Sequence, residues 1–291
     1  MCRHLAYLGP PATLASLILE PEHGLLAQSY APADMRGGGT INADGHGTGW
    51  YPPGAQAPVR VRSAVPLWSD TSFAALAGAT TSGAVLAAVR SATVGMPVTA
   101  TAPAPFTDGR WLFSHNGVVR GWPDSLAAAA ATLPVTDLMT LDAPTDAALL
   151  WALVRRGLAD GADPADLLAR VCADTERTAP GSRLNLLLTD GTTVWATAWR
   201  HALAVRTTPD AVTVASEPTH AFPDWTRVPD RHLVVARPGH HESHDLEVAR
   251  IGHSLAAVEC LGARAGTGLP IMKLSTLRDR LEAACPPCHH G

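Results

Sequence analysis

The first two residues of the chain bring together two groups that could act on a carbonyl carbon. The sequence begins MCRHL, so Cys2 becomes the first residue if the initiator methionine is removed. It would then carry a thiol and a free α-amine, with ordinary pKa values of about 8.5 and about 7.7. The amine could take the proton of the thiol, which makes Cys2 a candidate nucleophile with its own general base. Position alone is also consistent with a cysteine that has no chemical role.

A nucleophile of this kind needs donors for the oxyanion that it creates, and WLFSHNGVV offers them. An apolar stretch predicted as a strand runs into His115, Asn116 and Gly117. The side-chain amide of Asn116 and the backbone N–H of Gly117 could both point at one developing oxyanion. The simpler interpretation is an Asn-Gly turn between two strands, a common use of this dipeptide.

Two charged residues could hold the ends of an amino-acid substrate. Arg90 ends the apolar run of AVRSATVGMP, where its guanidinium could clamp a carboxylate. Asp146 in PTDAALL could hold an ammonium group in return. A surface arginine, and a helix N-cap at Thr145 or Asp146, are the structural alternatives.

Several other classes of function are not supported. The Gly-rich segment 36–51 lacks both a phosphate-loop and a dinucleotide-binding pattern, and Asn42 and Asp44 are predicted to hold turns there. The CPPCHH cluster at 285–290 is not expected to bind metal, so we expect neither a metal nor an organic cofactor. A net charge of −4 without a basic block argues against nucleic acid as a partner. No apolar run is long enough for a membrane span.

The compartment is predicted from the cysteines and the N-terminus. Five cysteines at irregular spacing do not indicate a disulfide framework, and no signal peptide is recognisable. We therefore expect a reducing, cytoplasmic compartment. Homo-oligomerisation is possible, and the sequence does not decide it.

The order of the predicted elements indicates an α+β fold. Short strands dominate the first part of the chain and are followed by two helices, predicted in 146–161 and 162–179. Strands return from residue 182, with DG at 190–191 and PD at 209–210 as their turns. Residues 2–240 are expected to form the catalytic domain and residues 241–291 a tail or accessory segment with one short helix.

Taken together, these motifs resemble the class II glutamine amidotransferases, which belong to the N-terminal nucleophile hydrolases. MCRHL, NADGHGTGWY, VRSATVG, FSHNG, the helix start at Asp146 and VASEP occur in the order found in that family. The resemblance covers roughly residues 2–235 and implies a four-layer αββα sandwich. It is strongest to a stand-alone subgroup, which implies hydrolysis of γ-glutamyl-hercynylcysteine sulfoxide, a small molecule, to glutamate and hercynylcysteine sulfoxide.

The resemblance also implies roles for individual residues. Cys2 corresponds to the nucleophile, and Asn116 with Gly117 to the oxyanion motif. Arg90 and Asp146 correspond to the groups that hold the α-carboxylate and α-ammonium of the glutamyl head. Further residues match motifs that contact the substrate or shape the site, namely Thr93, His115, Asn185, Ser216 and Glu217.

Two points of the resemblance leave alternatives open. His46 replaces a tryptophan usual in the family, which could alter how the amine half of the substrate is held. Trp50, Tyr51 and Trp122 are among the candidates for contacting that half. A hydrolase for another γ-glutamyl conjugate, or a glutaminase subunit serving a separate synthase, would have a similar sequence.

Overall fold

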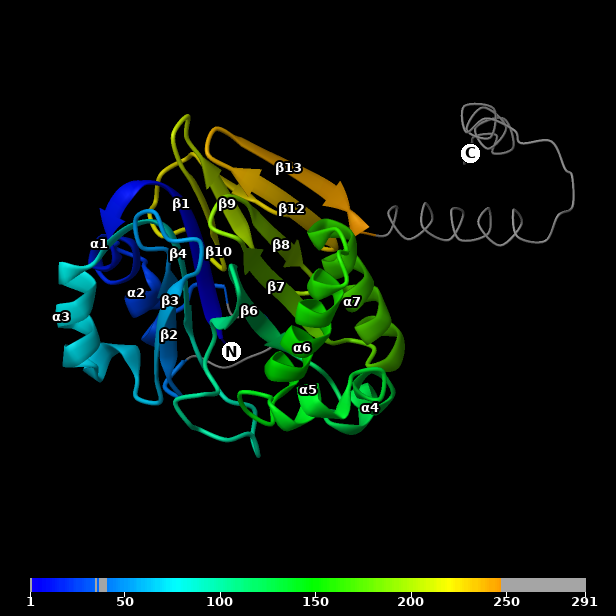
Figure 1. The fold of residues 1–291 in the computed structure, drawn as a ribbon. Helices are drawn as coiled ribbons and strands as arrows, with labels where there is room; N and C mark the ends of the chain where they lie inside the picture. The colour runs from blue at the N-terminus through cyan, green and yellow to red at the C-terminus, as the bar shows by residue number, and fades with distance from the viewer. Residues whose placement is uncertain (1, 35, 37–40, 247–291) are drawn as a thin grey trace, which may run out of the picture. The chain divides into compact units, whose positions relative to one another are not determined.

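Two antiparallel sheets face each other in the computed structural model, which describes residues 2–34, 36 and 41–246 (Figure 1). Among these residues the first sheet has the strand order β11-β9-β10-β1-β4-β2-β3 and the second the order β13-β12-β8-β7-β6-β5. The strands are β1 (Arg3–Thr13), β2 (His46–Trp50), β3 (Val59–Ser63), β4 (Thr81–Val89), β5 (Phe106–Asp108), β6 (Trp111–Val118), β7 (Arg183–Thr189), β8 (Val194–Ala198), β9 (Ala204–Thr207), β10 (Val212–Ala215), β11 (Trp225–Arg227), β12 (His232–Arg237) and β13 (His240–Asp245).

Helices cover the outer face of each sheet. Figure 1 shows α1, α2 and α3 beside the first sheet, and α4 to α7 beside the second. The helices are α1 (Leu14–Ile18), α2 (Leu25–Tyr30), α3 (Thr71–Ala79), α4 (Ala127–Ala130), α5 (Val135–Met139), α6 (Asp146–Ala159) and α7 (Pro164–Thr178), with short 3-10 turns η1 (Leu67–Ser69) and η2 (Asp124–Leu126). The layers therefore follow the order helix, sheet, sheet, helix, which confirms the predicted αββα sandwich.

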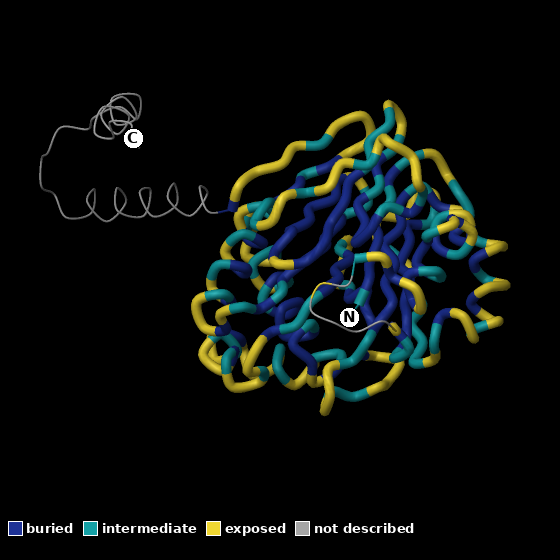
Figure 2. The backbone as a smooth tube through the Cα atoms, turned by 180° about the vertical axis from the view of Figure 1, so that it is seen from behind, coloured by how far each residue is buried: buried dark blue, intermediate teal, exposed yellow. Residues whose placement is uncertain are grey.

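Alternation of side chains along the central strands builds three apolar layers. On β1, Leu5 packs with α1 and α3, whereas Ala6 and Leu8 pack between the sheets. On β7, Leu187 faces the other sheet, and Leu186 packs under α6 and α7. Successive side chains of a strand point to opposite faces of the sheet. A strand that is buried on both faces therefore needs apolar residues at consecutive positions, with no polar residue between them. Figure 2 shows these central strands as buried.

The two long helices begin where the sequence predicts them. Thr145 caps α6 by accepting a hydrogen bond from the N–H of Ala148. Asp163 caps α7 in the same way, and Pro164 occupies its first turn, where no backbone donor is needed. Of the two N-cap candidates for α6, the structure therefore uses Thr145, and the carboxylate of Asp146 is left to act elsewhere.

The end of the described chain differs in one respect from the sequence-based expectation. The polar run that starts at His240 forms β13, which pairs along its whole length with β12. It is an edge strand, so its side chains need not be apolar, and a charged edge discourages pairing with other chains. The sheet thus continues to Asp245, past the expected limit at residue 240. The short helix and the CPPCHH cluster expected further along lie outside the described residues.

Candidate active site

Cys2 lies directly before β1, at the N-terminal end of this central strand of the first sheet. Arg3 pairs with Val89 of β4, and this register places Cys2 beside the segment that follows β4. Its Sγ atom is 3.8 Å from the carbonyl oxygen of Ser91, and the residue is half-buried. A side chain at this position is held by the sheet and is still accessible to a ligand.

A cavity beside the thiol collects most of the predicted site residues. They come from four separate parts of the chain, namely the N-terminus, the end of β4, the end of β6 and the start of α6. The predicted residues that line it are Cys2, Arg90, Thr93, His115, Gly117 and Asp146. The fold therefore brings together a thiol, a guanidinium and a carboxylate that the sequence separates by as many as 144 positions, from residue 2 to residue 146.

The end of β6 supplies an amide whose orientation is fixed. Asn116 is buried, and its Nδ2 donates to the hydroxyl oxygen of Ser216 at 2.9 Å. A β-carbon at position 117 would collide with the carbonyl oxygen of Arg183 and with the ring of His115, so only glycine fits there. Asn116 and Gly117 are therefore part of a continuous strand rather than the turn considered as an alternative.

Arg90 is held by its backbone and by its side chain. Its N–H donates to the carbonyl of Gly45, and its carbonyl accepts from the N–H of Asp44. The carboxylate of Asp44 also accepts from the N–H of Ala92 at 2.7 Å, so Asp44 bonds to the segment after β4 and not, as expected, within its own loop. The guanidinium is almost completely buried and donates to the carbonyl of Pro97 at 2.8 Å.

Asp146 presents its carboxylate to the cavity from the first turn of α6. One oxygen accepts from the N–H of Val119 at 2.9 Å, and the other from the N–H of Ala147 at 2.7 Å. These two backbone donors fix the position of the carboxylate. Asp146 and Arg90 belong to the lining of the same cavity.

His115 and Asn185 hold backbone around the site. His115 lines the cavity, and its Nε2 bonds to the carbonyl of Arg183 at 3.0 Å. Asn185 lies opposite Asn116 in the β6–β7 register. Its Nδ2 donates to the carbonyl of Ala202, and its Oδ1 accepts from the N–H of Trp199. Asn185 therefore anchors the β8–β9 turn and lines no cavity described here.

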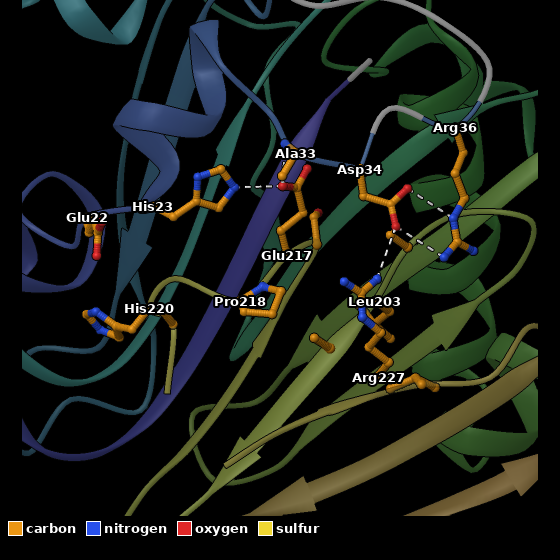
Figure 3. Close-up of a pocket in the computed structure, with 15 residues that line it drawn as sticks. Glu22, His23, Ala33, Asp34, Arg36, Leu203, Glu217, Pro218, His220 and Arg227 are labelled. Atoms are coloured by element: carbon orange, nitrogen blue, oxygen red, sulfur yellow. Dashed lines mark hydrogen bonds and ion pairs between the residues drawn. The ribbon is translucent and has the colours of Figure 1, made fainter. Parts of the chain in front are cut away.

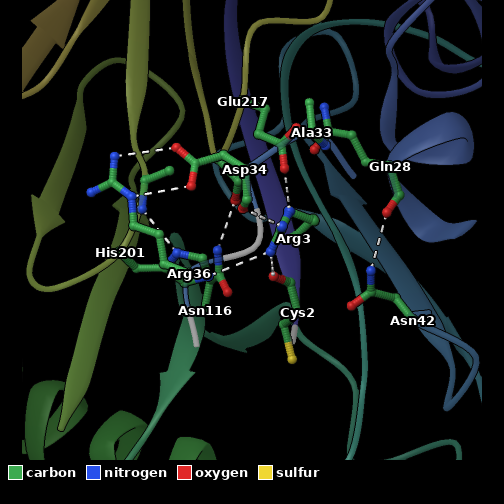
Figure 4. Close-up of polar contacts among 12 residues, drawn as sticks. Cys2, Arg3, Gln28, Ala33, Asp34, Arg36, Asn42, Asn116, His201 and Glu217 are labelled. Atoms are coloured by element: carbon green, nitrogen blue, oxygen red, sulfur yellow. Dashed lines mark hydrogen bonds and ion pairs between the residues drawn. The ribbon is translucent and has the colours of Figure 1, made fainter. Parts of the chain in front are cut away.

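A buried ion pair lies behind the thiol, between Arg3 and Glu217 (Figure 4). Arg3 is 1% exposed, and its Nε donates to Oε1 of Glu217 at 2.8 Å. Its other nitrogens donate to the carbonyls of Cys2 and Asp34. The sequence analysis did not identify Arg3 as a site residue, because its partners lie up to 214 positions away.

The surroundings of Glu217 hold it strongly in its ionised form. Burial alone raises the pKa of Glu217, but hydrogen bonds from His23 and from the N–H groups of Ala33 and Asp34, together with the charge of Arg3, lower it to about 2. His23 Nε2 lies 2.7 Å from Oε2 of the carboxylate.

Two histidines near Arg3 are kept neutral. Burial, followed by the charges of Arg3 and Arg183, lowers the pKa of His201 to about 3. The pKa of His4 also lies well below its ordinary value, and burial is the largest cause. Arg3 therefore remains the main cation beside Glu217 at neutral pH.

The aromatic residues considered for the amine half lie elsewhere. Trp50 packs in the core under α1 and α3, Tyr51 lies between the sheets, and Trp122 packs with the second helix layer. His46 contacts the ring of Phe73 and bonds to Asp70, away from the cavity beside Cys2. None of these four residues lines the cavity beside Cys2, so the structure does not support a direct role for them in substrate contact there.

Two structural absences concern only the part of the chain that is described. Within it, no group of three His, Cys, Asp or Glu residues is arranged to hold a metal ion. Within the same residues, no helix has the length and hydropathy needed to cross a lipid bilayer.

Comparison with known proteins gives the family. A model described as "Glutamine amidotransferases class-II" matches residues 24–213. The γ-glutamyl-hercynylcysteine sulfoxide hydrolase of Mycolicibacterium smegmatis is 45% identical over 82% of this chain and 97% of its own length. The protein of that name from Mycobacterium tuberculosis is 44% identical over 80% of this chain and 92% of its own length. A probable glutamine amidotransferase of Saccharomyces cerevisiae is 26% identical over 81% of this chain.

Solved structures support the fold. A glutamine aminotransferase class-II domain protein from Silicibacter pomeroyi superposes with a TM-score of 0.61 at 24% identity, over 84% of this chain and 99% of that one. The glutamine phosphoribosylpyrophosphate amidotransferase of Bacillus subtilis gives a TM-score of 0.54 over 84% of this chain and 49% of that one. The family model, the sequence identities and the fold agree. The chain belongs to the class II glutamine amidotransferase family.

The ion pair generates a prediction about stability and pH. Glu217→Gln should lower the free energy of unfolding at pH 7 by about 3 kcal/mol, because it leaves Arg3 buried without a counter-ion. The pKa of Glu217 in the folded state lies below its ordinary value of 4.5. Its stabilisation is therefore complete above pH 4.5 and is lost as the pH falls toward about 2. The difference between wild type and variant should shrink over that interval, as measured by urea unfolding at several pH values.

Glu20→Gln, an exposed carboxylate, is the control and should change stability little. A Glu217→Gln variant that is as stable as wild type at pH 7, or whose deficit is the same at pH 3, would contradict this account of the ion pair.

Proposed function

We propose that this protein hydrolyses the γ-glutamyl amide bond of γ-glutamyl-hercynylcysteine sulfoxide, a step of ergothioneine biosynthesis. One observation carries the proposal: Cys2, Arg90 and Asp146, which bear a thiol, a guanidinium and a carboxylate, line one cavity. A γ-glutamyl head suits these groups. It has an α-carboxylate for Arg90, an α-ammonium for Asp146, and a γ-carbonyl carbon, bonded to the amine half, for the thiol. The relatives named γ-glutamyl-hercynylcysteine sulfoxide hydrolase support this choice of substrate.

Binding of the glutamyl head uses both fixed charges. Arg90 exchanges its bond to the Pro97 carbonyl for two bonds to the α-carboxylate, which is the stronger, charge-assisted arrangement. Asp146 accepts from the α-ammonium, and Thr93 and His115 supply the polar edges of the cavity. Holding both ends of the head places its γ-carbonyl against the thiol, and orientation of this kind contributes several kcal/mol to catalysis, up to roughly 10.

The reaction then takes two steps. The α-amine of Cys2, exposed when Met1 is removed, takes the thiol proton, and the sulfur attacks the γ-carbonyl carbon. Nδ2 of Asn116 and the N–H of Gly117 hold the oxyanion, and the amine returns the proton to the leaving nitrogen as the C–N bond breaks. Water, deprotonated by the same amine, then attacks the γ-glutamyl thioester, and glutamate and the free thiol are formed.

We further propose that residues 2–240, extended by β13, form the catalytic domain, and that the segment after it is accessory. The reaction requires a free thiol at Cys2, so we assign it to a reducing, cytoplasmic compartment. All the proposed steps use groups of this chain and water.

The decisive test measures intact mass and glutamate release on one preparation, with γ-glutamyl-hercynylcysteine sulfoxide and glutamine as separate substrates. Loss of Met1 with fast release from the sulfoxide supports the proposal. Loss of Met1 with release mainly from glutamine would replace it with a glutaminase subunit for a separate synthase, and release from neither would point to another γ-glutamyl conjugate.

Cys2→Ala should abolish glutamate release, by about a thousandfold or more, because no other group forms the thioester. Folding and binding of the sulfoxide substrate should be retained, since the sulfur makes no strong hydrogen bond in the structure. Single-turnover assays and calorimetric titration measure the two effects. Turnover within tenfold of wild type would exclude Cys2 as the nucleophile.

Arg90→Ala should raise KM for the sulfoxide substrate about 100-fold, because a charge-assisted bond of roughly 1.5–3 kcal/mol is lost. The control is Arg110→Ala, an exposed arginine that does not line the cavity. Steady-state kinetics distinguish the two variants. An unchanged KM in Arg90→Ala would remove Arg90 from the binding of the head.

Ser216→Ala should lower kcat by tenfold or more and change KM little. The Ser216 hydroxyl is the acceptor that fixes Nδ2 of Asn116, and an oxyanion donor contributes only in the transition state. Ser114→Ala is the matched control, because it also removes a buried hydroxyl, one bonded to His4. If both variants lower kcat equally, Ser216 has no specific part in positioning Asn116.

A further inference from the structure

A cavity of about 700 Å³ lies behind Glu217 but is separate from the cavity beside Cys2 (Figure 3). Ser216 and Glu217 belong to its lining, and neither residue is more than 2% exposed. A ligand beside Cys2 would therefore touch only the walls of its own cavity. Two of these walls come from the segment 101–105, which precedes β5, and from the first turn of α6.

The segment 101–105 packs directly on the backbone of β2. A β-carbon at Gly47 would collide with the carbonyl oxygen of Ala104, which lines the cavity. A β-carbon at Gly49 would come within 3.1 Å of the ring of Pro105. Residues two apart on a strand share one face of the sheet. The two glycines of β2 therefore make room for this wall of the cavity.

Arg62 of β3 holds the same segment in place. It pairs with Gly47 in the β2–β3 register. Its Nη1 donates to the carbonyl of Thr101 at 2.6 Å, and its guanidinium lies over the ring of Phe106, 5.8 Å from the centroid. The side chain is only 9% exposed. Hydrogen bonds from a charged donor are strong, and little water competes for this one.

The same guanidinium also holds the wall formed by α6. Its Nη2 donates to Oδ1 of Asp142 at 2.6 Å, and Arg60 adds a longer bond of 3.2 Å to the same oxygen. Asp142 lies in the short segment before Thr145, which caps α6, and Asp146, which lines the cavity. A guanidinium presents several N–H donors in one rigid plane. Arg62 therefore links both walls through a single group.

We propose that Arg62 is a positioning residue that sets the spacing of these two walls, and through it the affinity for the glutamyl head. Arg62 does not itself line the cavity. It acts through Ala102 and Ala104 on one side and through Asp146, the proposed partner of the α-ammonium, on the other. The inference rests on the proposed function, because that function makes the glutamyl head the ligand of this cavity.

Arg62→Gln tests this role by calorimetric titration with L-glutamate, the product that carries the head without an amine half. Its Kd should rise about tenfold, because walls that are no longer held at a fixed spacing fit the head less well. The KM for γ-glutamyl-hercynylcysteine sulfoxide should rise by a similar factor. Its kcat should stay within about threefold of wild type, because Arg62 bonds to neither Cys2 nor Asn116.

Arg62→Lys is the conservative variant. A lysine keeps a positive charge beside Asp142, but its single nitrogen cannot reproduce the planar fork that also holds Thr101. We expect it to recover part of the affinity, with a Kd for L-glutamate between those of wild type and Arg62→Gln.

Arg155→Gln is the matched control. Arg155 lies on α6 and also pairs with two carboxylates, those of Asp137 and Asp108, but none of these three residues lines the cavity beside Cys2. It makes the same change of charge on the helix that carries Asp146, and the Kd for L-glutamate should stay within about twofold of wild type. Urea unfolding of each variant establishes that binding is measured on folded protein.

The outcomes separate this inference from the proposed function. An unchanged Kd in folded Arg62→Gln, or an equal loss in Arg155→Gln, would overturn the role of Arg62 even if the sulfoxide substrate is hydrolysed. If Arg62→Gln does not fold, Arg62→Lys decides, and an unchanged Kd there would have the same consequence. Conversely, weaker glutamate binding in Arg62→Gln, without glutamate release from γ-glutamyl-hercynylcysteine sulfoxide by wild type, would retain the role of Arg62 and refute the proposed hydrolysis.

Discussion

The buried ion pair of Arg3 and Glu217 joins the start of β1 to the segment after β10 and to the loop after α2. A buried pair is favourable only when its geometry is good and its remaining hydrogen-bonding groups are satisfied. Here the requirement is met by four groups from three parts of the chain: the carbonyls of Cys2 and Asp34, the N–H of Ala33 and the ring of His23. Satisfying the two charges therefore fixes the start of β1, the end of β10 and the loop after α2 relative to one another.

The neighbouring residues Ser216 and Glu217 connect this ion pair to the chemistry. Ser216 fixes the amide of Asn116, and Glu217 fixes Arg3, whose neighbour in the chain is the thiol residue. The proposed nucleophile and the proposed oxyanion donor are thus both linked to two consecutive residues at the end of one strand. Preorganised donors of this kind stabilise a transition state without reorganising during the reaction.

The αββα layers could be predicted from the sequence, and so could part of the lining of the cavity beside Cys2. The predicted residues of that lining were chosen because their types suit the proposed chemistry and because they lie at the ends of predicted elements. The roles of Arg3 and Asp44 could not be predicted, because each depends on a contact between distant segments. Strand β13 was missed because an exposed edge strand needs no apolar pattern, and the placement of Trp50 and Tyr51 depends on strand alternation in three dimensions.

The proposed head-binding residues bear on how a glutamyl hydrolase can differ from a glutaminase. Both classes must bind the same head, so residues with the proposed roles of Arg90 and Asp146 cannot distinguish their substrates. Discrimination must come from interactions with the amine half, and binding energy from such a remote group can be used to orient the carbonyl as well as to retain the substrate. Glutamine, whose leaving group is only ammonia, would gain nothing from such interactions, and its hydrolysis would rely on the head alone.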